Sequence, residues 1–105
     1  GLWAQIRLEE TGGGQREFGE SVLLLCRGSG FSFGFYDVYW YRQSPGGSLE
    51  WVSLISSSGT GTRHGTAVQG RAEISRDNSR SEAYLSLRDL RPQDSARYFC
   101  AVLTG

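Results

Sequence analysis

The stretch Asp94-Ser95-Ala96-Arg97-Tyr98-Phe99-Cys100 decides the fold, because it ends on the second of only two cysteines in the chain. The first cysteine, Cys26, is followed 14 positions later by Trp40. In a sandwich of two β-sheets, a disulfide between the sheets packs against a large apolar side chain. A tyrosine two residues before the second cysteine can return its hydroxyl to the preceding corner. The spacing of the two cysteines, the tryptophan and the tyrosine therefore favours a two-sheet sandwich.

Short segments of alternating side chains surround this stretch. A period of two places every second side chain on the same face of a β-strand. Turn-forming residues separate the segments at 12–14, 45–47, 58–61 and 77–79. Regular short strands with such turns between them indicate an antiparallel sandwich or barrel. The alternating sets are Val22, Leu24 and Cys26, then Ala72 and Ile74, then Ala83, Leu85 and Leu87, then Ala96, Tyr98 and Cys100; the first set leaves Leu23 and Leu25 on the outer surface.

Composition excludes several classes of function. The chain has 105 residues, enough for one domain, and 11 basic residues balance 11 acidic ones. A net charge of zero provides no electrostatic footprint for nucleic acid or an anionic membrane. One histidine and two cysteines cannot supply the ligands of a zinc site. We therefore expect no metal, no cofactor, no nucleic-acid partner and no direct membrane contact from this segment.

The single histidine also argues against catalysis. His64 is the only candidate for an imidazole base, and it falls in a predicted surface loop. No fixed arrangement of serine, histidine and aspartate can be argued around it. We therefore predict that the chain is not an enzyme.

The two cysteines lie too far apart for a redox pair and are even in number, which predicts a structural disulfide between Cys26 and Cys100. Closing a loop of this length stabilises a fold by roughly 4.5 kcal/mol in the chain-entropy model. Such a bond persists in an oxidising compartment, so the protein is predicted to be secreted or to lie on the extracellular face of the plasma membrane. The alternative is a pair of unrelated buried thiols in a cytosolic protein.

The first four residues, Gly1-Leu2-Trp3-Ala4, are apolar and end in a small residue. This pattern is typical of the end of a signal peptide. Residues 1–4 are accordingly predicted to be a leader remnant, or alternatively a disordered extension, and residues 5–105 to form the domain.

From Gln5 to Cys100 the chain resembles the heavy-chain variable domain of antibodies. The resemblance is carried by Leu49-Glu50-Trp51-Val52-Ser53 and by Ile74-Ser75-Arg76-Asp77-Asn78, which are sequence motifs typical of heavy chains. The form Gly70-Arg71-Ala72 is similar to bird or reptile heavy chains. The resemblance implies an all-β, immunoglobulin-like antiparallel sandwich of variable type. Because only residues 101–105 follow Cys100, it also implies a germline-like segment without the joining strand, incomplete at its C-terminus.

The resemblance further implies that function is antigen recognition through hypervariable loops. Tyrosine and phenylalanine provide rigid contact area, and serine, threonine and glycine provide adaptable hydrogen bonds. The first loop and the strand that follows it contain Phe35, Tyr36, Asp37 and Tyr39. The second loop contains Ser56, Ser57, Ser58, Thr60 and Thr62, followed by Arg63 and His64.

A second surface implied by the resemblance would pack against a light-chain variable domain. Leu49 and Trp51 favour pairing, since an unpaired domain would expose them as an apolar patch. Tyr41 departs from the smaller aliphatic residue usual in the family. The matching positions are Tyr41, Gln43, Leu49, Trp51 and Phe99, and the implied structural residues are Trp40, Tyr98, Arg71 and Asp94, the last two as a bidentate salt bridge.

The antigen cannot be named from these residues. An alternative function stays open, because a heavy-chain-like variable domain also occurs in T-cell-receptor-type or innate cell-surface receptors that bind a protein ligand.

Overall fold

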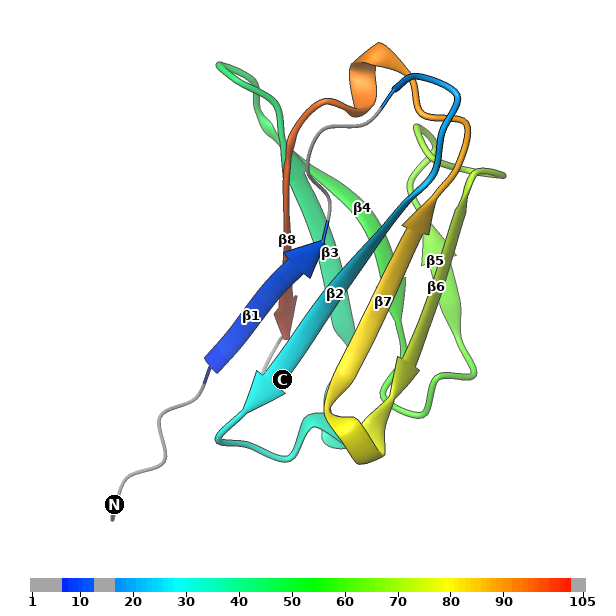
Figure 1. Ribbon diagram of the computed structural model, residues 1–105. Helices are drawn as coiled ribbons and strands as arrows, with labels where there is room; N and C mark the ends of the chain where they lie inside the picture. The colour runs from blue at the N-terminus through cyan, green and yellow to red at the C-terminus, as the bar shows by residue number, and fades with distance from the viewer. Residues whose placement is uncertain (1–6, 13–16, 103–105) are drawn as a thin grey trace.

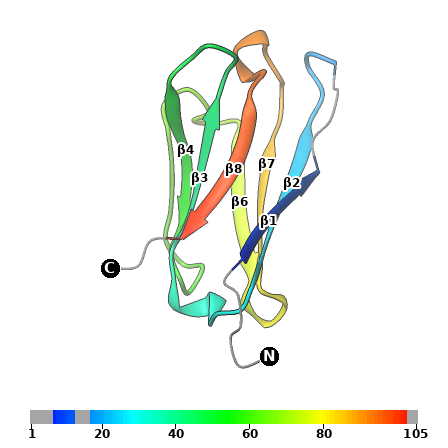
Figure 2. The same cartoon turned by 90° about the vertical axis from the view of Figure 1, so that its left-hand side faces the viewer.

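Eight antiparallel strands form two sheets in the computed structural model, which describes residues 7–12 and 17–102. Figures 1 and 2 show the sheets packed face to face. This arrangement confirms the predicted all-β sandwich. The first sheet has the order β1 (Arg7–Gly12), β2 (Val22–Ser29), β7 (Glu82–Leu87) and β6 (Ala72–Asp77). The second has the order β5 (Thr62–His64), β4 (Leu49–Ile55), β3 (Val38–Gln43) and β8 (Arg97–Val102). Single turns of 3-10 helix occur at η1 (Phe33–Phe35), η2 (Asn78–Arg80) and η3 (Pro92–Asp94).

A disulfide between Cys26 and Cys100 joins β2 of one sheet to β8 of the other, as predicted, with a Cα–Cα distance of 6.2 Å. Trp40 lies opposite Cys100 in the β3–β8 register and is fully buried. Its indole Nε1 has no hydrogen-bond partner among the described residues. The core around the disulfide combines Phe33 of η1 and Val68 of the β5–β6 connection with side chains on the inner faces of both sheets: Leu24, Val38, Val52, Ile55, Ala72, Ala83, Leu85 and Leu87.

The alternation in β2 determines which of its leucines enter the core. Leu24 is buried, whereas Leu23 is 59% exposed and Leu25 is half-buried on the outer face. Leu25 lies opposite Tyr84 of β7 in the register. Leu23 lies opposite Ser86 of β7.

A buried ion cluster lies between the sheets at the end opposite the β6–β7 turn. The Asp94 carboxylate accepts hydrogen bonds from Arg71 at 2.8 and 3.0 Å and from Arg42 at 2.9 Å. All three side chains are at most 5% exposed. The Tyr98 hydroxyl donates to the Asp94 carbonyl at 2.8 Å and accepts from Arg42 at 2.9 Å. The cluster therefore connects η3, β8, β3 and the residue that precedes β6.

The two arginines stabilise the charged form of Asp94. Burial alone would raise its pKa, but hydrogen bonds from Arg71, from the Arg91 backbone N–H and from Arg42 outweigh burial and lower the pKa to about 2. Burial likewise would lower the pKa of Arg42, and hydrogen bonds with Tyr98, Glu50 and Asp94 raise it instead. The cluster is therefore charged throughout the physiological pH range.

We predict that Asp94→Asn destabilises the fold by about 3 kcal/mol, because it leaves two buried guanidinium groups without their counter-charge. The matched control is Asp89→Asn. Asp89 forms an exposed 4.0 Å pair with Arg88, and its loss should cost less than about 0.5 kcal/mol. Urea denaturation of both variants measures the difference, and equal losses would contradict the assignment.

The same carboxylate predicts a loss of stability in acid. The folded-state pKa of Asp94 is about 2 and its unfolded value is about 4. The stabilisation from ionised Asp94 is therefore complete above about pH 4 and is lost as the pH falls towards 2. The gap in unfolding free energy between the native chain and Asp94→Asn should narrow across this interval. A constant gap from pH 6 to pH 2 would contradict this prediction.

Candidate functional site

Three connecting segments lie together at one end of the sandwich, which we call the loop end. They are the segment from 30 to 37 that includes η1, the β4–β5 hairpin at 56–61, and the β6–β7 turn with η2. All three appear at the lower end of Figure 1. They meet there because β2, β4 and β6 all finish at the same end of the sandwich. The structure thus brings both predicted hypervariable loops to one surface.

Arg76 of β6 holds the two loops together. Its guanidinium donates to the carbonyl of Ser56 at 2.8 Å and to the carbonyl of Phe33 at 3.0 Å. The guanidinium carbon lies 4.8 Å from the centroid of the Phe33 ring. Asn78 donates to the carbonyl of Ser57 at 2.8 Å. This role of Arg76 could not be predicted from the sequence, because nothing in its local pattern shows which loops its side chain reaches.

Asp37 links the first loop directly to the second. Its carboxylate accepts the backbone N–H of Ser57 at 2.9 Å. Within the hairpin, the Ser56 hydroxyl accepts the N–H of Gly61 at 2.9 Å. Gly59 has a φ of +85°, a conformation that favours glycine and allows the tight turn. These contacts fix the hairpin backbone while the Ser58 and Thr60 side chains stay exposed.

Aromatic side chains in the first loop differ in exposure. Phe35 in η1 is 82% exposed. Tyr36 is half-buried, and its ring lies 5.6 Å from the ring of Phe31 in an edge-to-face arrangement. The loop end therefore presents one exposed aromatic ring beside a rim of small hydroxyl side chains.

The predicted position of His64 in a surface loop is wrong. Thr62, Arg63 and His64 form strand β5, paired with β4. The His64 Nδ1 lies 2.6 Å from the hydroxyl of the fully buried Ser53. Burial lowers the pKa of His64. The strand is only three residues long, too short for its alternation to be recognised in the sequence.

The outer surface of the second sheet forms a second candidate site, which we call the open face. Paired residues in an antiparallel sheet share a face, so the strand registers define its members. A shift in the β3–β4 register leaves Val52 as an extra, buried residue, and Trp51 lies opposite Tyr41. The open face consists of Arg97, Phe99 and Ala101 of β8, Gln43, Tyr41 and Tyr39 of β3, Leu49, Trp51 and Leu54 of β4, and Arg63 of β5.

Aromatic and aliphatic side chains dominate the open face. The rings of Tyr39 and Tyr41 are stacked at 6.4 Å, and those of Tyr41 and Phe99 at 5.9 Å. Leu49 is 55% exposed and Trp51 is 36% exposed. All five residues matched to the light-chain interface lie on this face. Exposed apolar side chains gathered on one face in this way are typical of interaction surfaces.

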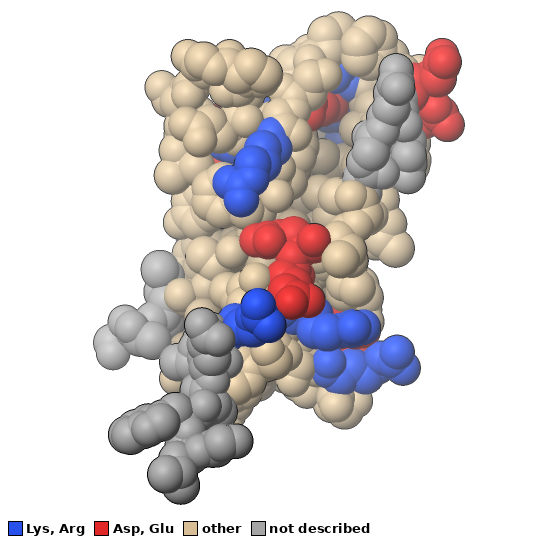
Figure 3. Space-filling model, turned by 60° about the vertical axis from the view of Figure 1, so that its left-hand side comes forward, with Lys and Arg blue, Asp and Glu red and all other residues tan. Residues whose placement is uncertain are grey.

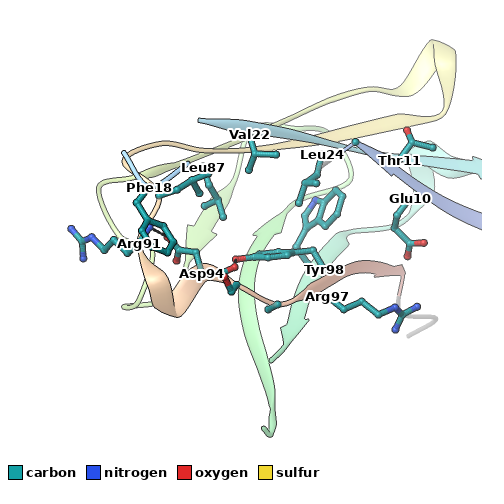
Figure 4. A pocket seen from close by; sticks show the side chains of 15 residues that line it. Glu10, Thr11, Phe18, Val22, Leu24, Leu87, Arg91, Asp94, Arg97 and Tyr98 are labelled. Carbon is teal, nitrogen blue, oxygen red and sulfur yellow. Dashed lines mark hydrogen bonds between the residues drawn. The ribbon is translucent and has the colours of Figure 1, made fainter. Parts of the chain in front are cut away.

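A cleft of about 450 Å³ opens between the sheets beside β1 and β8. Trp40 and Tyr98 line it, and Glu10 accepts the backbone N–H of Cys100 at 3.0 Å. Figure 4 shows Tyr98 reaching towards Asp94 while Arg97 extends away in the other direction. Figure 3 shows basic and acidic side chains close together on this side, with no broad field of one sign. Within the described ranges no cluster of three metal-ligating side chains occurs.

We predict that Arg76→Ala loosens the loop end without unfolding the sandwich. Losing two charge-assisted hydrogen bonds should lower the local opening free energy by about 1–2 kcal/mol. Hydrogen exchange at the N–H groups of Ser57 and Tyr36 should accelerate about tenfold or more, while β2 and β7 amides stay protected. The control is Arg80→Ala, which removes a 67% exposed arginine from the adjacent turn. Identical exchange in both variants would contradict the role of Arg76.

Comparison with known families agrees with this architecture. The family model of the immunoglobulin V-set domain matches residues 15–105, which is most of the chain. Domains of this family are generally extracellular binding modules that contact protein ligands or pair with other immunoglobulin domains. The two four-stranded sheets, the disulfide between them and the buried tryptophan agree with this match. The chain belongs to the immunoglobulin V-set family.

Proposed function

We propose that this V-set domain recognises antigen as the variable region of an immunoglobulin heavy chain, beside a light-chain variable domain. One observation carries the proposal: an exposed apolar face adjoins a loop end whose backbone is fixed. The apolar face suits a partner domain, and the loop end suits a variable ligand. The heavy-chain assignment is further supported by the sequence motifs at 49–53 and 74–78, which resemble those of heavy chains.

The loop end supplies the chemistry of recognition. Arg76 and Asp37 fix the loop backbones before a ligand arrives, which reduces the ordering cost of binding. Phe35 provides exposed aromatic area, and serine and threonine hydroxyls provide adaptable hydrogen bonds. The proposed antigen contacts are Phe35, Tyr36, Asp37, Tyr39, Ser56, Ser57, Ser58, Thr60, Thr62 and Arg63, with His64 behind them as a supporting residue.

The open face supplies the pairing surface. Leu49 and Trp51 lie next to the stacked rings of Tyr41 and Phe99, and a partner domain would remove this apolar area from water. Gln43 donates to the Gly47 carbonyl at 3.2 Å, so its amide oxygen remains available to a partner. Tyr39 follows the first loop and lies on the open face, so this face extends to the loop end. A partner domain on the open face would therefore have its own loops beside the loop end.

The alternative is a heavy-chain-like V-set domain in a T-cell-receptor-type or innate receptor that binds a protein ligand. Such a domain would use the same open face towards a different variable domain. Among the described residues no helix is long and apolar enough to cross a membrane. Because the two functions differ in the variable domain that pairs with the open face, the identity of that partner separates them.

We predict that the chain binds an immunoglobulin light-chain variable domain and that Leu49→Ser weakens this binding about tenfold, since it removes exposed apolar area at the interface. The matched control is Leu23→Ser, which changes a leucine of similar exposure on the opposite sheet. Isothermal titration calorimetry with purified light-chain variable domain measures both. Equal affinity in both variants would contradict the proposed pairing surface. Binding only to a T-cell-receptor variable domain would favour the alternative.

A further inference from the structure

The charged side chains of the open face are of one sign. Its ten residues include Arg97 at one corner and Arg63 at the diagonally opposite corner, and none is acidic. Glu50 lies on β4 between two open-face residues, but its side chain, 49% exposed, already pairs with the buried Arg42. The face is therefore an apolar surface with a positive charge at each of two corners.

Arg97 is positioned to act in an interface. Its side chain is exposed, and its guanidinium carbon lies 5.2 Å from the centroid of the Phe99 ring. The β3–β8 register places it beside Gln43, at the end of the face nearest the β3–β4 hairpin. Among the described residues no carboxylate lies within salt-bridge distance of it. The stacking holds the guanidinium against the apolar surface instead of letting it extend freely into water.

Covering the apolar face would place this guanidinium at the edge of a dry interface. An arginine that loses water there is costly unless an anionic group accepts its hydrogen bonds. A carboxylate is the natural acceptor, because its two oxygens match the planar guanidinium. The position of Arg97 therefore constrains the chemistry of whatever covers Phe99 and Tyr41.

A second copy of this chain does not meet that requirement. Two open faces packed together would bring up to four guanidinium groups to one interface with no carboxylate on either face. Like charges held at an interface without counter-charges disfavour association. The charges therefore favour a different domain as the occupant.

We propose that the partner domain carries an aspartate or glutamate opposite Arg97, and that this charge pair selects a heterologous partner over a second copy. The inference rests on the proposed pairing through the open face and adds the charge of the partner. It assigns Arg97 a role in specificity that the apolar residues of the face cannot supply.

The test uses one light-chain variable domain as the probe, prepared in two sets. Every variant of the light-chain domain carries one substitution at an exposed position on the rim of the face that would pack against the open face. The new residue is glutamate in one set and lysine in the other. Surface plasmon resonance then measures affinity and association rate for the native chain, for Arg97→Glu and for the control Arg88→Glu. Arg88 is exposed and lies outside the open face, so the control changes net charge equally.

We expect one rim position at which the glutamate version binds the native chain about tenfold tighter than the lysine version. Arg97→Glu should reverse this preference, and Arg88→Glu should preserve it. The preference should also weaken at high salt. Thermal melting of each variant checks that it is folded.

Three outcomes would overturn the inference, and they are distinguishable. If every version of the light-chain domain binds and the residue at position 97 does not change the preference for glutamate over lysine, the proposed charge pair is contradicted but the proposed pairing is not. Failure of every version to bind, with all proteins folded, would remove the pairing itself and the charge pair with it. Stable self-association of the native chain through the open face would likewise contradict the exclusion of a second copy.

Discussion

The covalent bond between β2 and β8 is the constraint on which the rest of the structure depends. It requires Cys26 and Cys100 to point into the space between the sheets. Because strand side chains alternate, an inward Cys100 turns its neighbours Phe99 and Ala101 outward. The registers of β3 and β4 then extend that outward row across the sheet. The location of the open face is thus a geometric consequence of the disulfide.

Charge within the sandwich is organised in a different way from charge on its surface. Asp94 holds two arginines in a buried cluster that spans both sheets, where each charge has a close partner. Arg97 lies only three residues further along the chain, yet it stacks on an aromatic ring at the surface. The first arrangement stabilises the fold, and in the proposed pairing the second would restrict what can bind to the open face. The same side-chain chemistry would then serve stability in one place and selectivity in the other.

Much of the sandwich could be predicted from the sequence, because alternation is a local property. The outward position of Leu23 and the inward position of Cys26 both follow from it. The hydrogen bonds from Arg76 to the two loops could not be predicted. Their acceptors lie 20 and 43 positions away in the sequence, and only the folded chain brings them together. The burial of Arg42 could have been found from its alternation with Val38 and Trp40, but a charged residue is rarely assigned to a core. The position of His64 in a strand could not be predicted, because β5 is too short to show a period.

The extra residue in β4, Val52, limits how this domain can diversify. It allows Trp51 to face outward and Ile55 to face inward in one short strand. Deleting or adding one residue between Trp51 and Ile55 would place both side chains on the same face, with the indole in the core or the isoleucine on the open face. The hairpin at 56–61 has no such restriction, because it lies beyond Ile55 and Thr62, the last paired residues of β4 and β5. Changes in length are therefore tolerated at the tip of the hairpin, whereas β4 can vary by substitution only.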